Sequence, residues 1–256
     1  MTDTLWKDRT VFITGATAGF GVAIARRFAA QGANLILLGR RNDRLEAVKA
    51  ELGRPTHLIP LDVRDRAAVE AAVAALPAPF DKIDLLVNNA GLALGLEAAY
   101  EADVDDWETM IDTNLKGLAY VTRAVLPGMV GRNRGHVINL GSIAGTYPYF
   151  GGNMYGATKA AVAQFSLNLI TDLNKTKIRV TNIEPGLCGG SEFSNVRFHG
   201  DDARAAKVYE NVEPLLPEDV AEAVYWAASQ PAHVNINRIE MMPVAQAPGG
   251  LTVFKD

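Results

Sequence analysis

Tyr155 and Lys159 are two side chains whose types and spacing could carry out acid–base chemistry. They stand four residues apart in an alanine-rich segment, and residues at this spacing share one face of a helix. A neighbouring ammonium favours the phenolate, which lowers the pKa of a tyrosine from its ordinary value of about 10. We therefore expect Tyr155 to exchange a proton with an alcohol or carbonyl group near neutral pH. The pair alone is weak evidence, because a Tyr and a Lys reach this spacing by chance.

Ser142 is a second candidate for this chemistry. It follows residues 136–140, an apolar run that predicts a strand. From the end of that strand, its hydroxyl could hydrogen-bond the same substrate oxygen as Tyr155. The predicted helix that carries Tyr155, residues 154–172, is apolar nearly all round. We therefore expect it to be covered on several sides and to lie in a subunit interface.

A glycine-rich loop lies between a predicted strand at residues 10–13 and a predicted helix at residues 22–31. This order is typical of the first turn of a dinucleotide-binding fold, where the backbone and the helix N-terminus bind a pyrophosphate. The glycine spacing differs from the commoner Gly-x-Gly-x-x-Gly, so a glycine-rich turn without a ligand is the alternative. The coenzyme contacts predicted in this loop are Gly15, Thr17, Gly19, Phe20 and Gly21.

The end of the second predicted strand, residues 34–38, indicates which coenzyme is bound. NAD-specific folds carry an acidic residue there, but this chain has Gly39, Arg40 and Arg41. Two guanidinium groups suit a 2′-phosphate, so we expect NADP. The alternative is a solvated basic helix start, although a helix N-terminus disfavours cations.

Two further strand ends carry candidate coenzyme contacts. Asp62 and Val63 follow a predicted strand at residues 57–61, where Asp62 could contact the adenine amine or cap the helix predicted at residues 67–76. A strand at residues 83–87 runs into Asn88. This segment suits close passage of a coenzyme together with a side-chain tie to the neighbouring strand, or else an ordinary turn. The contacts predicted after this strand are Asn89, Ala90 and Gly91.

Asn114 interrupts a helix predicted over residues 103–129, together with Gly117. Asparagine is unfavourable inside a helix, so it could loosen a turn and free a carbonyl for water. A later strand at residues 178–183 is followed by Glu184, Pro185 and Gly186.

Periodicity fades over residues 187–213, which predicts a long substrate loop that acts as a lid. A helix at residues 217–230 and a strand at residues 234–242 complete the chain. Strands alternating with helices, without a shift in composition, predict one α/β domain over residues 1–256. We expect a doubly wound parallel sheet of the Rossmann-like type, with helices on both faces.

Composition excludes several classes of protein. The net charge of −4 gives no indication of nucleic-acid binding, and the single cysteine excludes an internal disulfide. Four scattered histidines without paired cysteines predict no metal site. The chain shows neither the apolar core of a signal peptide nor a run of about 18 apolar residues. We expect a cytoplasmic protein without a membrane partner.

Taken together, these motifs resemble those of the short-chain dehydrogenase/reductase family over the whole chain. They occur in the family's order, as Thr14-Gly-x-x-x-Gly-x-Gly21, Asp62-Val63, Asn88-Asn-Ala-Gly91, Asn114, Ser142, Tyr155-x-x-x-Lys159 and Pro185-Gly186. The resemblance implies that Tyr155 is the proton donor or acceptor and that Ser142 orients the substrate oxygen. It implies that Lys159 lowers the tyrosine pKa and holds the nicotinamide ribose, and that Asn114 holds a water molecule. It also implies a homotetramer.

Segments 14–21, 106–114 and 192–198 are similar to those of NADP-dependent 3-hydroxy acid dehydrogenases within that family. These enzymes act on serine, L-allo-threonine and 3-hydroxypropionate, the reduced form of malonic semialdehyde. The alternatives are a sulfoacetaldehyde reductase, a 3-oxoacyl thioester reductase and a non-catalytic NADP-binding regulator. Residues 187–213 hold three basic and five acidic side chains, and this acidic excess disfavours docking of an acyl carrier. All four catalytic residues of the family, Asn114, Ser142, Tyr155 and Lys159, are present, which disfavours a non-catalytic regulator.

Two positions depart from the family pattern. Ala18 replaces a basic residue before the second glycine, so recognition of the phosphate falls on Arg40 and Arg41. The family's threonine after Pro185-Gly186 is displaced, which makes Cys188 and Ser191 the candidates near the nicotinamide amide.

Arg197 is the candidate for binding an anionic substrate. A small hydroxy acid has little apolar surface, and a guanidinium matches a carboxylate with two parallel hydrogen bonds. Arg197 is the first cation after Gly186, and we expect Phe193 and Phe198 to flank it and exclude water. The alternative is a surface arginine paired with one of the nearby acidic residues, which are Glu192, Asp201 and Asp202.

Overall fold

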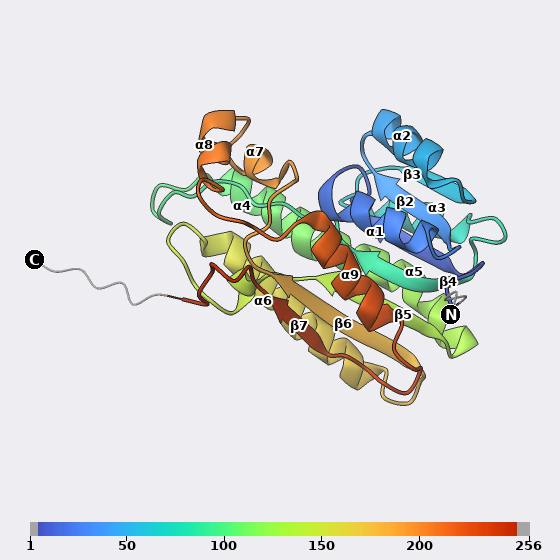
Figure 1. The fold of residues 1–256 in the computed structure, drawn as a ribbon. Coiled ribbons are helices and arrows are strands. Elements are labelled where there is room, and N and C mark those ends of the chain that lie inside the picture. Colours follow the sequence, from blue (N-terminus) through green and yellow to red (C-terminus); the bar gives the residue numbers. More distant parts are fainter. Residues whose placement is uncertain (1–4, 250–256) are drawn as a thin grey trace, which may run out of the picture.

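All the strands described belong to one sheet in this computed structural model, which describes residues 5–249. Neighbouring strands pair in parallel in the order β3-β2-β1-β4-β5-β6-β7 (Figure 1). The strands are β1 Thr10–Thr14, β2 Asn34–Gly39, β3 Thr56–Pro60, β4 Ile83–Asn88, β5 Gly135–Leu140, β6 Ile178–Pro185 and β7 Arg238–Met241. The winding reverses between β1 and β4, and ligands of such folds bind outside the carboxyl ends of the strands at this point.

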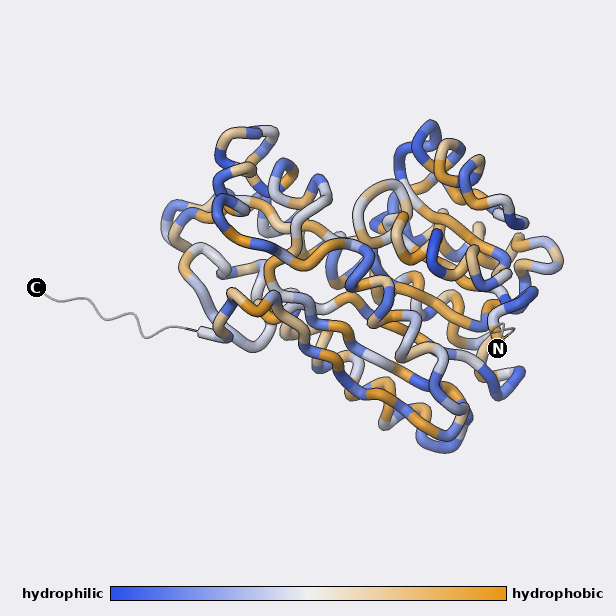
Figure 2. Tube along the Cα trace, in the orientation of Figure 1, coloured by the Kyte–Doolittle hydropathy of each residue, from blue (hydrophilic) through white to orange (hydrophobic). Residues whose placement is uncertain are grey.

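Helices cover both faces of the sheet, so the predicted fold class is confirmed. Along β1, Val11 and Ile13 point into one core layer and Phe12 into the other. The first layer is closed by α1 Gly19–Ala29, α2 Asn42–Leu52 and α9 Pro217–Ala228. The second is closed by α3 Arg66–Ala74, α5 Leu118–Arg132 and α6 Asn153–Asp172. The inner strands are hydrophobic along most of their length (Figure 2). The predicted domain also includes residues 1–4 and 250–256, which lie outside the described residues.

The helix around Asn114 is interrupted as predicted. After α4 Val104–Ile111, the chain forms a π-helical segment, η1 Asp112–Gly117, before α5 begins. The predicted end near residue 129 is wrong, because α5 continues through Pro127 to Arg132. Pro127 is exposed, so the backbone carbonyl that loses its helical partner lies near water, while buried Met129 continues the apolar face.

Residues 187–213 do not form the long irregular loop that we expected. They include two short helices, α7 Phe193–Arg197 and α8 Asp202–Lys207, which lie beside α4 in Figure 1. The Asp201 side chain caps α8 by accepting a hydrogen bond from the backbone N–H of Arg204. Helices of this length are too short to produce a recognisable hydrophobic period.

The last strand is also shorter than the predicted residues 234–242. The Asn235 side chain accepts from the N–H of Val180 and donates to its carbonyl, at 2.7 and 2.9 Å. A side chain thus replaces the backbone pairing that would have lengthened β7. Within residues 5–249, no helix has the length and apolarity to cross a membrane, and no cluster of three metal-binding side chains occurs.

Candidate active site

A cleft of about 730 Å³ opens at the carboxyl ends of the strands. It lies at the reversal between β1 and β4 and extends to the ends of β5 and β6. Of the residues that the sequence assigns to the site, all but Gly21, Asn114 and Arg197 line it, within the described part of the chain. The candidate coenzyme and proton-transfer residues therefore share one cavity.

The glycine loop after β1 packs directly against the end of β4. Gly15 has a φ of +66°, and a Cβ there would lie 2.8 Å from the Cα of Ala90. Asn89 donates hydrogen bonds to the carbonyls of Thr14 and Gly15, at 2.9 and 3.1 Å. Gly21 lies beneath the loop, against the Gly15 carbonyl, so it permits close packing of α1. The loop leaves the first backbone N–H groups of α1 available to an anion.

A buried chain of amide and hydroxyl groups ties the strands behind the cleft together. The side chain of Asn88 donates to those of Asn139 and Thr122, each at 2.8 Å. Asn139 in turn donates to the Ser166 hydroxyl on α6 at 2.8 Å. The predicted side-chain tie between β4 and its neighbouring strand is confirmed, and it extends to α5 and α6.

Arg41 does not stand alone at the start of α2. Its guanidinium lies 2.8 Å from the Glu192 carboxylate and donates to the Thr17 hydroxyl at 2.9 Å. Arg44 contacts the other oxygen of Glu192 at 2.6 Å. Hydrogen bonds from Arg44 and Arg41 lower the pKa of Glu192. Sequence reasoning missed this role, because Glu192 is about 150 positions from these arginines and no local pattern links them.

Asp62, which the sequence assigns to the coenzyme, lines the cleft and is held by Arg64. Arg64 donates to Asp62 from its backbone N–H at 3.0 Å and from its guanidinium at 2.7 Å. Burial acts to raise the pKa of Asp62, but these hydrogen bonds outweigh it and leave the pKa lowered. The alternative in which Asp62 caps the following helix is wrong, since Asp65 caps α3 by accepting from the N–H of Ala68.

The four candidate catalytic residues come together from η1, the end of β5 and α6. Asn114 is buried and exchanges hydrogen bonds with the backbone N–H and carbonyl of Leu92, both at 2.8 Å. Lys159 is buried and donates to the Leu140 carbonyl at 2.7 Å. A Cβ at Gly91 would lie 3.2 Å from the Asn114 amide oxygen and 3.5 Å from the Lys159 ammonium nitrogen, so the two groups flank that glycine.

Ser142 and Tyr155 both line the cleft, and their side chains lie next to each other. Ser142 begins the turn η2 Ile143–Gly145, accepts from the N–H of Ala144 at 3.1 Å and donates to the Pro185 carbonyl at 3.4 Å. Burial raises the pKa of Tyr155 well above its ordinary value, and a hydrogen bond with Ser142 opposes that shift. The ring of Phe193 packs edge-on to that of Tyr155, with centroids 5.9 Å apart.

The expected lowering of the Tyr155 pKa by Lys159 is wrong for this structure. The Lys159 ammonium lies 5.8 Å from the centre of the Tyr155 ring and is directed at the Leu140 carbonyl. Burial lowers the pKa of Lys159 to about 8 and raises that of Tyr155. Desolvation therefore outweighs the attraction between charges that the spacing suggests.

Arg197 lies behind the wall of the cleft, close to Tyr155. It donates to the Tyr149 hydroxyl at 2.8 Å and to the Gly95 carbonyl at 3.1 Å, and its guanidinium carbon is 5.8 Å from the centre of the Tyr155 ring. The suggested pairing with Glu192 is wrong, since Glu192 contacts Arg41 and Arg44. Phe198 does not exclude water as expected, because it is buried beneath the guanidinium of Arg204.

Sequence reasoning missed several residues that line this end of the cleft. Tyr147, Tyr149 and Phe150 belong to an aromatic run just before α6, which is a signal that could have been noticed. Gln246 accepts from the backbone N–H of Leu187 at 2.7 Å and lies against Gly186. Nothing in its sequence neighbourhood indicates this contact.

Comparisons with known proteins identify the family to which the chain is similar. A profile of the short-chain dehydrogenase family matches residues 9–200. The chain is 65% identical to the NADP-dependent 3-hydroxy acid dehydrogenase YdfG of Salmonella typhi over 245 residues, which are 96% of this chain and 99% of that protein. It is 50% identical to the serine 3-dehydrogenase of Agrobacterium fabrum, over 96% of this chain and 98% of that protein.

Solved structures give the same result. The closed form of serine dehydrogenase complexed with NADP+ superposes with a TM-score of 0.95 and 63% identity, over 96% of this chain and all of that one. A serine dehydrogenase from Escherichia coli superposes with a TM-score of 0.82 and 58% identity, over 93% and 99% of the two chains.

We expect Arg40 and Arg41 to select a coenzyme that carries a 2′-phosphate. A charge-assisted contact contributes about 1.5–3 kcal/mol, which corresponds to about 10- to 150-fold in affinity. Replacing both arginines with Ala should weaken NADPH binding by this range and leave NADH binding nearly unchanged, as measured by fluorescence titration. Arg26→Ala, which alters an exposed arginine of α1, is the matched control. Wild-type binding of NADH as tight as that of NADPH would contradict this assignment.

Proposed function

Because the chain belongs to the short-chain dehydrogenase family, we propose that it transfers a hydride between NADP(H) and a small 3-hydroxy acid or the corresponding carbonyl compound. The candidates are serine, allo-threonine and 3-hydroxypropionate, with malonic semialdehyde as the oxidised form of the last. The observation that carries the proposal is the placement of Arg197. A guanidinium lies 5.8 Å from the centre of the ring of the candidate proton donor, just behind the wall of a cleft whose other end suits a dinucleotide.

The residues at the coenzyme end fit NADP. Gly15 and Gly19 adopt positive φ angles beside the start of α1, and neither β2 nor the two residues that follow it include an acidic side chain. Arg40 and Arg41 line the cleft at that strand end. The relatives named for NADP, and the superposed complex with NADP+, agree with the prediction of this coenzyme. The nicotinamide supplies the hydride chemistry, and the protein supplies position and a proton path.

Tyr155 is the group that we assign to proton transfer at the substrate oxygen. Because burial raises its pKa, the phenol of the free protein holds its proton at neutral pH and can donate it to a carbonyl oxygen during reduction. We assign the orientation of the same oxygen to the Ser142 hydroxyl, which lies beside Tyr155. Lys159 and Asn114 fix the backbone beside these groups: Lys159 donates a hydrogen bond to the Leu140 carbonyl, and Asn114 accepts one from the N–H of Leu92.

The Arg197 guanidinium is the group that we assign to the acid group of the substrate. Tyr149 and Gly95 fix its orientation, and Phe193 covers one edge of Tyr155. A guanidinium fixed in this way can form two hydrogen bonds with a carboxylate or with a sulfonate. Sulfoacetaldehyde is therefore the alternative substrate that this geometry allows.

We also propose that the protein is a homotetramer, with the face of α5 and α6 in an interface. Val130 on α5 and Leu167 on α6 are exposed apolar side chains, at 43% and 49%. Both helices cover the same face of the sheet, so association there would bury these side chains.

The role of Tyr155 is tested by Tyr155→Phe, which keeps the ring and removes the hydroxyl. Turnover should fall by about 10²-fold or more, because the proton donor is lost, while the affinity for NADPH persists. Steady-state rates and coenzyme titration measure the two effects separately. Turnover close to that of the wild type would rule out this assignment.

Substrate recognition is tested by initial rates on serine, allo-threonine, 3-hydroxypropionate, sulfoacetaldehyde and an acetoacetyl thioester, with both coenzymes. Arg197→Ala should raise KM for the preferred acid by about 10- to 150-fold, since one charge-assisted contact is lost. KM for the methyl ester of the same acid should change little. Arg197→Lys should recover part of the loss, because an ammonium cannot reproduce the planar guanidinium.

Arg204→Ala removes another cation of the same segment and serves as the control for Arg197. An equal rise in KM for the acid and for its methyl ester would show that Arg197 supports the structure of the loop and does not recognise the acid group. A preference for the thioester would overturn the proposed substrate class.

The oligomeric state is tested by sedimentation at micromolar concentration, where we expect four copies. Leu167→Glu should dissociate the assembly, because it places a charge in the proposed interface. Val104→Glu alters an exposed apolar side chain on α4 and should leave the assembly intact. A monomeric wild-type protein would contradict the proposal.

A further inference from the structure

Glu184 is a buried carboxylate for which the proposed reaction has no use. It stands near the end of β6, directly before Pro185, and is 1% exposed. Taking a carboxylate out of water is unfavourable, and an acidic side chain is rarely fully buried unless it is paired. Its surroundings therefore indicate what the charge does.

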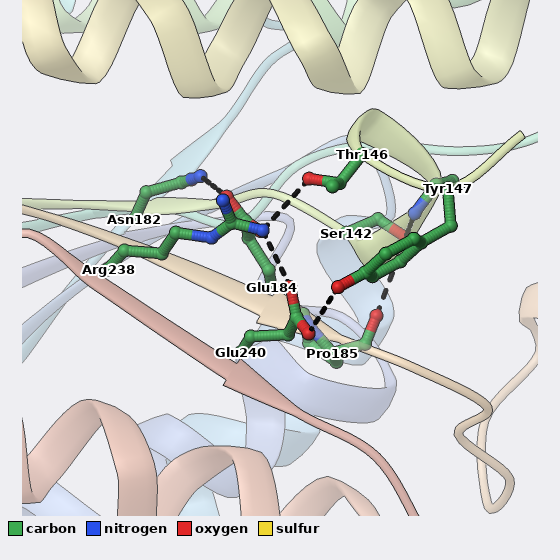
Figure 3. Close-up of polar contacts among 9 residues, drawn as sticks. Ser142, Thr146, Tyr147, Asn182, Glu184, Pro185, Arg238 and Glu240 are labelled. Carbon is green, nitrogen blue, oxygen red and sulfur yellow. Dashed lines mark hydrogen bonds and ion pairs between the residues drawn. The ribbon is translucent and has the colours of Figure 1, made fainter. Parts of the chain in front are cut away.

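Three side chains of β6 and β7 share one face of the sheet with Glu184 (Figure 3). Asn182 stands two residues earlier on β6, and the register places it opposite Arg238 and places Glu184 opposite Glu240. Asn182 donates to one oxygen of Glu184 at 2.6 Å. Arg238 lies 2.6 Å from the other oxygen and 2.6 Å from Glu240.

The contact between Arg238 and Glu184 is held by charge. Within the described part of the chain, the Glu184 oxygen nearest to Arg238 accepts no hydrogen bond of good geometry, although the guanidinium is 2.6 Å away. The opposite oxygen has its hydrogen bond from Asn182. A neutral amide at this position could keep the hydrogen bond from Asn182 but would lose the ion pair with Arg238.

Asn182 and Arg238 contact the two ends of the turn that carries Ser142. At the start of the turn, a Cβ at Gly141 would lie 2.7 Å from the Asn182 amide oxygen, so that backbone is pressed against Asn182. At its end, Arg238 donates to the Thr146 hydroxyl at 2.8 Å (Figure 3). The Ser142 hydroxyl itself donates to the carbonyl of Pro185, the residue bonded to Glu184.

We propose that Glu184 is a positioning residue, whose buried charge holds Arg238 and Asn182 so that the turn directs the Ser142 hydroxyl toward Tyr155. This inference rests on the proposed role of Ser142 in orienting the substrate oxygen. It predicts that Glu184 affects the reaction only through Ser142. A merely structural ion pair would instead alter stability, or would alter turnover whether or not Ser142 is present.

Glu184→Gln preserves the shape of the side chain and an acceptor for Asn182, but it removes the charge that faces Arg238. We expect kcat to fall by about 10-fold, with KM and the NADPH dissociation constant changed by less than about twofold. In a Ser142→Ala background, the same substitution should change kcat by less than about twofold, because the group that it positions is gone. Thermal unfolding of each variant reports stability separately.

Asp84→Asn provides a matched control near the amino end of the central strand β4, away from the cleft. Asp84 also pairs with an arginine, Arg134 at 2.8 Å, and accepts from a backbone N–H, that of Thr10 at 3.0 Å. Its substitution should lower the melting temperature without changing kcat. Arg238→Lys is a second variant, in case Glu184→Gln does not fold. The lysine ammonium keeps the charge but cannot contact Glu184, Glu240 and Thr146 in the same geometry. Arg238→Lys should therefore also lower kcat, and this decrease should disappear in the Ser142→Ala background.

Equal losses in kcat with and without the Ser142 hydroxyl would overturn the inference, and so would an unchanged kcat in the single variant. Wild-type turnover in Ser142→Ala alone would remove the role of Ser142 and this inference with it. That outcome is distinct from failure of the proposed substrate class, which the substrate panel reports for the unmodified protein.

Discussion

The close approach of α6 to the turn after β5 is the constraint on which the rest of the site depends. A Cβ at Gly145 would lie 2.8 Å from the backbone nitrogen of Ala160, and one at Gly156 would lie 2.9 Å from the carbonyl oxygen of Ala144. Glycine at both positions lets helix and turn meet backbone to backbone. At this separation Lys159 reaches the Leu140 carbonyl, and Tyr155 lies beside Ser142. Burial of both titratable groups follows, and their pKa values shift in opposite directions.

The short helix α7 connects the two ends of the cleft. Glu192, just before its first residue, contacts the arginines at the start of α2, and Arg197, its last residue, contacts Gly95 and Tyr149. Between them Phe193 packs on Tyr155. The segment over the reacting groups is thus fastened at one end beside the proposed phosphate site and at the other beside the proposed acid site.

Much of the fold and of the coenzyme end could be predicted, because local rules determine them. The glycines of the first loop, the apolar strands and the mid-helix Asn114 each depend on the backbone geometry of a few neighbouring residues. Contacts between distant segments could not be predicted in this way. Glu192 meets Arg41, Arg238 meets Glu184, and Gln246 meets Leu187, each through the tertiary fold.

The Tyr155 pKa could not be predicted for a related reason. The four-residue spacing lets the sequence predict that the Lys159 charge lies near Tyr155. The desolvation that raises the Tyr155 pKa depends instead on residues that pack from several elements. Similarly, the Asp201 cap of α8 has a recognisable residue type, but the helix that it begins is too short to show a hydrophobic period.

The parallel arrangement of the strands has a consequence for how the chain can vary. Because every strand runs the same way, the segments that follow the strands build the cleft, and those that precede them only return the chain. Gly53, in such a returning segment before β3, has a φ of +59° with nothing within 4 Å of the position of a Cβ. Insertions, affinity tags and new chain ends are accommodated best at that edge, where a change in length leaves the reacting groups in place.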